Sequence, residues 1–448
     1  MFDFETRRAL GRSYRHFAVA VATLVIVSSC GIVAQSPTPS TPAAGSPTAA
    51  PPTAASVPPT TSGPGATATS GATSTPSATE STASATPEAP LPTPAGQVVF
   101  GNWPGYMAFS RRSGTFPLID QFQQESGIAT TYLEHVNDNS EFFNIVQPDL
   151  ELGNPTGYDV MVLSDWMIDR LISLGYIQPL DHRLLPTFQA NANELYVNQW
   201  YDPGNVYSIP WQAGIVGIAY NRALTGREIT SFDDLFDPAF AGRVGLFSEM
   251  RDTMCLTILS LGKECADATL EDAAAARDKL LAASETGQFR AFYGNDYWDQ
   301  LSGGNLAVTM AWSGDATQIK LYENPDIEFV IPDAGGLLFI DNMVIPNNAA
   351  HVADAHVLMD YWYDVDNATA ETEYIGYFSP VRGIAERVLQ DAETARAEGD
   401  LEWATQLEVI AQTAVPTEEE LANVHQYKVL TEEEERTWNN LFNQVVFE

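Results

Sequence analysis

A recurring unit restricts the fold more than any other feature: a short apolar run, a turn with polar and aromatic side chains, then a helical pattern. One such unit begins with the apolar run Val244–Phe247 and ends in an apolar-periodic stretch, residues 254–261, that Gly262 closes. Strands that alternate with helices are typical of α/β folds with a mostly parallel sheet. Ligands of such folds bind where strands end and helices begin, so the turns are the predicted place of a site.

The turn of this unit carries two carboxylates, Glu249 and Asp252. Acidic side chains are common at a helix N-terminus, because they accept hydrogen bonds from free backbone N–H groups and suit the helix dipole. The stretch by itself therefore allows two interpretations, helix capping or ligand binding. The helix end is also expected to keep both acids ionised, so that they could meet a cation without titrating.

Helix and strand signals elsewhere give further expectations. The patterns predict a helix over residues 140–146, a strand over 337–346 and acidic helices at the C-terminus. Thr417 with Glu420, and Thr431 with Glu434, have the spacing of capping boxes at helix starts.

The first thirty residues have the pattern of an export signal. Arginines precede an apolar segment, residues 17–27, that is too short to span a bilayer. The segment runs into Ser28-Ser29-Cys30-Gly31, and small residues before a cysteine resemble a bacterial lipobox. The resemblance implies a lipoprotein signal peptide over residues 1–29, with cleavage before Cys30 and acylation of its thiol. An ordinary secretory signal with an incidental cysteine is the alternative.

Residues 30–95 are almost wholly Ser, Thr, Pro, Ala and Gly. Such a segment buries too little apolar surface to offset the entropy of ordering it, so we expect a disordered tether. No later stretch is long and apolar enough for a transmembrane helix. The mature protein is thus expected at the outer face of the cytoplasmic membrane, on the cell surface or in the periplasm, attached through the lipid alone.

The charge of the chain excludes one class of partner. The chain has 22 Lys and Arg against 58 Asp and Glu, a formal net charge of −36, and the acidic excess lies in residues 96–448. Such a field repels nucleic acid and attracts cations. We therefore expect no nucleic-acid partner.

Cysteine and histidine are scarce. In the folded part only Cys255 and Cys265 remain, and an oxidising compartment would permit a disulfide between them. A straight helix from Cys255 would carry the chain about 15 Å away, so the chain would have to turn back, and the pairing stays open. Their spacing fits no zinc motif and the chain has six His, so no metal site is predicted.

Aromatic and acidic side chains collect in the turns of several units. They are Trp103, Tyr106, Ser164, Asp165, Trp166, Glu249, Asp252, Trp312, Asp315 and Tyr377, with Phe339 and Asp341 from a strand. The chain shows no Gly-rich phosphate loop, no Ser-His-acid arrangement and no nucleophilic Cys, so no catalytic residue and no cofactor are predicted. Rings and carboxylates in one cleft suit an organic cation, although the first two rings could instead pack on the core.

At these residues the chain resembles a known family, the bacterial spermidine/putrescine-binding proteins of ABC transporters. The resemblance covers nearly all of residues 97–448 and depends on the order and spacing of short motifs. These motifs are Asn102-Trp103 with Tyr106, FFNIVQPDLELGNPTGYDVMVLS, YSIP, SFDDL before Gly242-Arg243-Val244, AWSG, DNMVIP and IGY.

The resemblance implies ten ligand-binding residues. They are Trp103, Tyr106, Ser164, Trp166, Glu249, Asp252, Trp312, Phe339, Asp341 and Tyr377. The sequence departs from the family pattern where Trp166 replaces a usual Tyr, Phe339 replaces a Trp and Pro104 replaces a small polar residue. The acid pair also has Asp and Glu exchanged. Asp315 is charged where some relatives bind the shorter diamine, and its role stays open.

The resemblance also implies a two-lobed, periplasmic-binding-protein-like α/β fold of type II with a hinge. The implied segments are an N-lobe of residues 96–215 and 341–385 and a C-lobe of residues 216–340 and 386–448. A monomer of this kind captures a polyamine between the lobes and delivers it to an ABC permease, and it is not an enzyme. The choice between putrescine and spermidine stays open.

Two other functions remain as alternatives. One is a protein of the same fold that binds another organic solute or only signals. The other is an exported glycosidase in which Glu249 or Asp252 would serve as acid and base.

Overall fold

The structure, a computed structural model, describes residues 91–110 and 112–447. The predicted signal peptide, Cys30 and nearly all of the tether lie outside the described residues. Among the helices of the described part, none combines the length and the apolar character needed to cross a bilayer.

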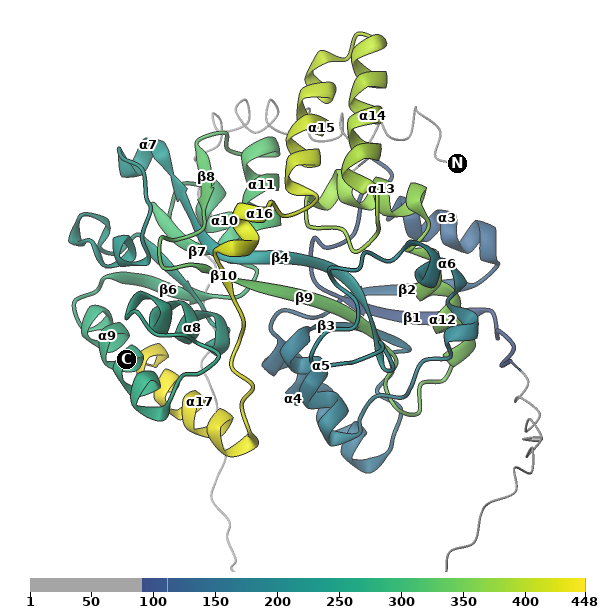
Figure 1. The fold of residues 1–448 in the computed structure, drawn as a ribbon, viewed down its shortest axis with the longest axis horizontal. Helices are drawn as coiled ribbons and strands as arrows, with labels where there is room; N and C mark the ends of the chain where they lie inside the picture. Colours follow the sequence, from purple (N-terminus) through teal and green to yellow (C-terminus); the bar gives the residue numbers. More distant parts are fainter. Residues whose placement is uncertain (1–90, 111, 448) are drawn as a thin grey trace, which may run out of the picture. The chain divides into compact units, whose positions relative to one another are not determined.

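One mixed sheet runs through the described chain (Figure 1) in the order β2-β1-β3-β9-β4-β7-β5-β6, with β10 beside β9 and β8 beside β4. The strands are β1 (Gln97–Asn102), β2 (Ala129–Glu134), β3 (Val160–Ser164), β4 (Ser208–Asn221), β5 (Val244–Phe247), β6 (Phe289–Tyr293), β7 (Val308–Trp312), β8 (Ile327–Val330), β9 (Gly336–Val344) and β10 (Val424–His425). Every residue of β4 is buried, as expected for a strand that is covered on both faces.

The sheet has two parallel groups joined by antiparallel strands. We call β2-β1-β3 the first sheet group and β7-β5-β6 the second sheet group; the pairs within each group are parallel. The long strands β4 and β9 are antiparallel to each other, and β9 is antiparallel to β3 and β4 to β7. The predicted, mostly parallel arrangement therefore holds within the two groups, whereas the centre of the sheet is antiparallel. The chain passes to the second group along β4 and returns along β9, so these two strands run in opposite directions.

Helices cover both groups. Figure 1 shows α4 and α5 beside the first sheet group, and α8, α9 and α17 beside the second. The helices are α3 (Pro117–Ser126), α4 (Asn139–Leu152), α5 (Asp165–Leu174), α6 (Pro186–Asn191), α7 (Arg222–Thr225), α8 (Met250–Ser260), α9 (Leu270–Ser284), α10 (Tyr297–Ser302), α11 (Ser313–Tyr322), α12 (Val352–Tyr361), α13 (Val365–Ile375), α14 (Ile384–Ala397), α15 (Leu401–Thr413), α16 (Glu418–Ala422) and α17 (Glu432–Val446).

The strand Val244–Phe247 and both C-terminal capping boxes are confirmed. Other boundaries differ from the prediction: α4 continues through Pro148 to Leu152, and α8 begins at Met250, before the predicted stretch 254–261. The first turn of α8 contains buried polar side chains, so its apolar periodicity begins only after the helix has started. Tertiary contacts override the hydrophobic pattern here.

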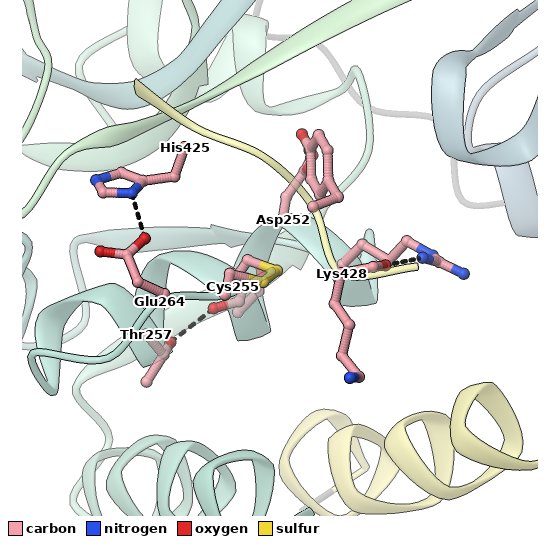
Figure 2. The surroundings of a disulfide bond; sticks show 10 residues. Asp252, Cys255, Thr257, Glu264, His425 and Lys428 are labelled. Carbon is pink, nitrogen blue, oxygen red and sulfur yellow. Dashed lines mark hydrogen bonds and ion pairs between the residues drawn. A yellow bond between two sulfur atoms is a disulfide. The ribbon is translucent and has the colours of Figure 1, made fainter. Parts of the chain in front are cut away.

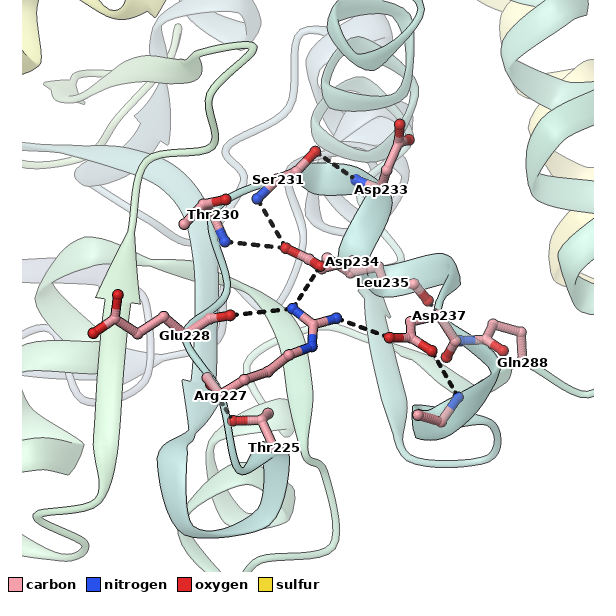
Figure 3. A network of polar contacts seen from close by, with 11 residues as sticks. Thr225, Arg227, Glu228, Thr230, Ser231, Asp233, Asp234, Leu235, Asp237 and Gln288 are labelled. Atoms are coloured by element: carbon pink, nitrogen blue, oxygen red, sulfur yellow. Dashed lines mark hydrogen bonds and ion pairs between the residues drawn. The ribbon is translucent and has the colours of Figure 1, made fainter.

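The loop that enters β5 is fixed by a polar network (Figure 3) around Arg227, which forms ion pairs with Asp234 (2.7 Å) and Asp237 (2.8 Å). Asp234 also completes a capping box with Ser231 at the start of the 3₁₀ turn Phe232–Phe236. Gln288, the residue before β6, donates to the backbone carbonyls of Leu235 and Asp237 and thereby ties this region to the start of β6.

A disulfide joins Cys255 in α8 to Cys265 (Figure 2), and their Cα atoms lie 5.2 Å apart. The helix ends at Ser260, and Gly262, with φ of 73°, lets the chain turn back. The sequence left this pairing open, because only the turn after the helix decides whether the two sulfurs can meet.

Candidate functional site

A cavity with about 520 Å³ of empty space, part of it open to solvent, is lined by residues from both sheet groups. It is lined by Trp103, Pro104, Tyr106, Asn139, Ser164, Trp166, Glu249, Asp252, Asn295, Trp312, Asp315, Phe339, Asp341, Tyr377 and Tyr427. All ten residues that the sequence nominated for ligand binding are among them.

The lining comes from turns at the ends of strands in both sheet groups. From the first group, the loop after β1 supplies Trp103, and the end of β3 with the start of α5 supplies Ser164 and Trp166. From the second group, the turn after β5 supplies the acid pair, and the end of β7 with the start of α11 supplies Trp312 and Asp315. Strand ends of both groups therefore face one space, as strand topology of this kind predicts.

Asp341, in the crossing strand β9, has both carboxylate oxygens bound to hydroxyl groups. Ser164 Oγ donates to Oδ1 (2.7 Å) and the Tyr106 hydroxyl donates to Oδ2 (3.0 Å). Burial raises the pKa of Asp341 to about 6, although both hydroxyls favour the charged form. The side chain is thus a fixed acceptor that still lacks a cationic partner among the described residues that line the cavity.

Asp315 has a similar environment on the other side. It accepts hydrogen bonds from the hydroxyls of Tyr377 (2.6 Å) and Tyr297 (2.8 Å), and burial raises its pKa to about 6. The sequence left the role of Asp315 open. The structure places it in the cavity wall, whereas Asp165 stays outside the lining and accepts from the backbone N–H of Trp166 (2.7 Å).

Glu249 occupies the N-cap position of α8, but its side chain accepts no capping hydrogen bond from the helix. Its Oε2 instead accepts from the backbone N–H (3.3 Å) and the Nδ2 (3.4 Å) of Asn139, at the start of α4. The capping interpretation is therefore wrong for Glu249. Asp252, one turn further, accepts from the Tyr427 hydroxyl (2.6 Å).

The expectation that the helix end keeps both acids ionised is also wrong. Burial raises the pKa of Asp252 to about 7, and burial together with Asp138 and Asp252 raises that of Glu249 well above its usual value. Desolvation of a fully buried carboxylate outweighs the field of a helix terminus.

The rings of the lining are held by other rings. Trp312 stacks on Phe247 with centroids 4.2 Å apart, and Tyr106 meets Tyr377 edge to face at 4.8 Å. Trp103 and Tyr106 are buried core residues as well as lining residues, so both interpretations of these two rings hold together. Pre-packed rings offer flat surfaces for the methylene groups of a ligand at little entropic cost.

Sequence reasoning missed Asn139, Asn295 and Tyr427 as lining residues. Asn139 was within a recognised helix start, where a polar residue is ordinarily a cap, so its contact with Glu249 left no separate signal. Tyr427 follows the short strand β10 in a stretch without a motif. Only the path of the C-terminal segment past α8 brings its hydroxyl to Asp252.

The lining combines four carboxylates with aromatic rings, and the described residues that line it include no lysine or arginine. A cation that enters can donate charge-assisted hydrogen bonds to the acids and rest on the ring faces. Buried carboxylates without a directly paired counter-charge are costly, so a bound cation would stabilise the site.

Comparison with known proteins assigns the chain to a family. A model of the family described as bacterial extracellular solute-binding protein matches residues 117–398. The chain belongs to this family. The solved structure of a spermidine/putrescine ABC transporter from Listeria monocytogenes has 28% sequence identity and a TM-score of 0.66, covering 78% of this chain and 99% of that one. The expected periplasmic-binding-protein-like α/β fold is thereby confirmed.

Family relatives agree with the resemblance stated from the motifs. The spermidine/putrescine-binding periplasmic protein 1 of Haemophilus influenzae is 29% identical over 264 residues, which cover 58% of this chain and 70% of the relative. The spermidine/putrescine-binding periplasmic protein of Escherichia coli K12 is 27% identical over 297 residues, covering 66% and 80%. The family is one of solute-binding proteins, and this favours binding over the glycosidase alternative.

Proposed function

We propose that this protein is an extracytoplasmic solute-binding protein that captures a polyamine, putrescine or spermidine, and delivers it to an ABC permease. The observation that carries the proposal is the cavity in which four buried carboxylates face aromatic rings without a lysine or arginine in the described lining. The names of the relatives support the same ligand class.

In the proposed complex, Asp341 and the pair Glu249 and Asp252 bind ammonium groups. The rings of Trp103, Trp166, Trp312, Phe339 and Tyr377 cover the methylenes, while Tyr106 and Ser164 orient Asp341. A carboxylate that carries a proton in the free cavity releases it when the cation arrives, because the cation favours the charged form. No group of the ligand is chemically changed.

Closure follows from where the contacts originate. Ligand contacts on both sheet groups favour the arrangement that brings the groups together, because a ligand shifts an equilibrium only by its differential affinity. The lobes in this proposal are residues 96–215 with 341–385 and residues 216–340 with 386–448. The hinge is then formed by the crossing strands β4 and β9.

The proposal includes the cellular setting. Cys30 carries a lipid that is the only membrane attachment, the protein acts as a monomer, and the closed form docks on the permease. The acidic folded part is consistent with a function that gathers cations from the medium.

Calorimetric titration of the purified protein with putrescine, spermidine and spermine tests the proposal. We expect saturable one-to-one binding that weakens at higher salt and is lost in Trp312→Ala. Absence of both heat and thermal stabilisation with every polyamine would contradict it and would favour another organic solute in the same cavity.

A further inference from the structure

Outside the cavity, three charged side chains connect helices of the two sheet groups. Glu435 in α17 accepts hydrogen bonds from two arginines: Arg170 of α5 donates to Oε1, and Nη2 of Arg251, in α8, donates to Oε2 (3.0 Å). The helix α17 packs on α8 and α9 of the second group, whereas α5 packs on β3 and β9. The contact between Arg170 and Glu435 therefore joins one group to the other.

Arg251 makes a second contact between the groups. Its guanidinium lies 4.2 Å from the ring centroid of Trp166, which lines the cavity from α5. The Arg251 side chain is 5% exposed, and its Nη1 also donates to the backbone carbonyl of Lys428 (3.0 Å). A buried arginine needs its counter-charge, so the geometry of Arg251, and with it the support of the Trp166 ring, depends on Glu435.

Arg170 is anchored on its own side. Its guanidinium lies 4.3 Å from the ring centroid of Phe143 in α4, so a planar group spans Phe143 and Glu435. Separation of the two sheet groups would break the bond between Arg170 and Glu435 and lift Arg251 from Trp166. Both contacts would be lost together, because the two arginines bind the same Glu435 carboxylate.

We propose that Arg170, Arg251 and Glu435 form a latch that holds α5 against α8 and α17 when the cavity is closed, and that Arg251 positions the Trp166 ring. This inference goes beyond the proposed function, because the latch acts on opening and closing whatever the ligand is. It rests on the polyamine function only for its kinetic readout.

Arg170→Met is the sharpest variant, because it removes one contact between the groups, keeps an apolar side chain over Phe143 and leaves Arg251 paired with Glu435. The matched control is Arg387→Met. Arg387 is similarly exposed (34% against 27%) and pairs with Asp366 of α13, away from the cavity lining. Arg170→Lys keeps the charge but not the planar fork, so it should restore part of the effect.

Pulsed EPR distances on the full chain test the latch without any ligand. Spin labels on non-canonical residues at Leu152 (77% exposed, end of α4) and Leu270 (57% exposed, start of α9) report the separation of the two groups. We expect Arg170→Met to add longer distances, Arg170→Lys to add fewer, and Arg387→Met to match the unsubstituted protein. An unchanged distribution in Arg170→Met, or equal changes in both methionine variants, would overturn the latch.

Stopped-flow release of spermidine gives the second readout. Arg170→Met should release ligand up to about fivefold faster, as expected for a partly exposed ion pair. Failure of the unsubstituted protein to bind any polyamine would contradict the proposed function alone, because the EPR distances would still decide the latch. An unchanged release rate in a binding-competent Arg170→Met variant would count against the latch.

Discussion

The two acidic ends of the cavity differ in how they are held. Asp341 lies in the middle of the sheet, and the β3–β9 register pairs it with Ser164. It accepts a hydrogen bond of 2.7 Å from the Ser164 hydroxyl. Glu249 is the N-cap residue of α8 and accepts a hydrogen bond from Asn139 of α4, and Asp252, in the first turn, accepts one from Tyr427 of the C-terminal segment. One acid is placed by backbone pairing, the other two by contacts between separate elements.

The end of the cavity with Asp341 is therefore fixed by the sheet, whereas the end with Glu249 and Asp252 is assembled from separate elements. A strand register sets neighbouring side chains to a fixed distance, so Asp341 should keep its geometry whether the sheet groups are apart or together. The contact of Asn139 with Glu249 crosses from the first group to the second, so it should form only in the closed arrangement. We expect Asp341 to recruit the ligand and the pair on α8 to respond to closure.

The largest effect should come from the fixed acid. Asp341→Asn should weaken polyamine binding about 100-fold, because a buried ammonium would lose its charged partner. Glu249→Gln should cost about tenfold, since Asp252 remains beside it. Titration calorimetry of both variants at one salt concentration measures the difference in their polyamine affinity. Equal losses of affinity would contradict the distinction between the two ends.

The next prediction concerns the disulfide of α8, the helix that carries Glu249 and Asp252. The double variant Cys255→Ser/Cys265→Ser should lower the free energy of unfolding by about 2–3 kcal/mol, because the unfolded chain gains the freedom of the opened loop. Affinity should change less than stability, since Asp341 is untouched. Denaturant titration, with the reduced unsubstituted protein as control, provides the measurement, and unaltered stability would contradict the prediction.

The affinity of the cavity for a polyamine should depend on pH. Burial raises the pKa of Asp341 and Asp315 to about 6 and that of Asp252 to about 7, so these carboxyls take up protons as pH falls from 8 to 5. The cation needs the charged forms, so affinity should fall about tenfold per pH unit for each proton that must leave. Calorimetry in buffers of different ionisation enthalpy should detect proton release on binding, and heats independent of the buffer would refute it.

The same pKa shifts determine whether the ligand-free protein becomes more or less stable as the pH rises. The native pKa values lie above the unfolded value of about 3.9, so the native state binds more protons between about pH 4 and 7. The contribution of these groups to stability is present at low pH and is lost as pH rises through the native pKa. Asp252→Asn should lower the slope of this loss across about pH 4 to 7, while Asp341 and Asp315 still contribute up to about pH 6, and chemical denaturation across pH measures the slope.

The smallest effect should come from the C-terminal partner. Tyr427→Phe keeps the ring but removes the hydroxyl that donates to Asp252, and one such bond corresponds to about a two- to tenfold loss of affinity. The pKa of Asp252 should rise further, so the pH dependence of binding should move upwards. Titration at pH 8 and pH 7 checks both effects, and an affinity equal to that of the unsubstituted protein at both values would show that Tyr427 is dispensable.

The sequence by itself determined the features that neighbouring residues encode. The apolar run Val244–Phe247 is the strand β5, the two Thr-x-x-Glu patterns are capping boxes, and the turns of the recurring unit supply the cavity lining. Such features depend on side chains within a few positions of one another, so their pattern is visible without the fold. The ordered motifs also led to the family.

Only the tertiary structure decided the antiparallel centre of the sheet, the contact of Asn139 with Glu249, the arrival of Tyr427 at Asp252 and the protonation of the acids. The partners of Glu249, Asp252 and Asp341 lie 110 to 235 positions away along the chain, as for Glu249 with Asn139 and Asp341 with Tyr106. Their pKa values are set by how completely distant elements exclude water. Exclusion of water is a property of the packed chain, and no local pattern of residues encodes it.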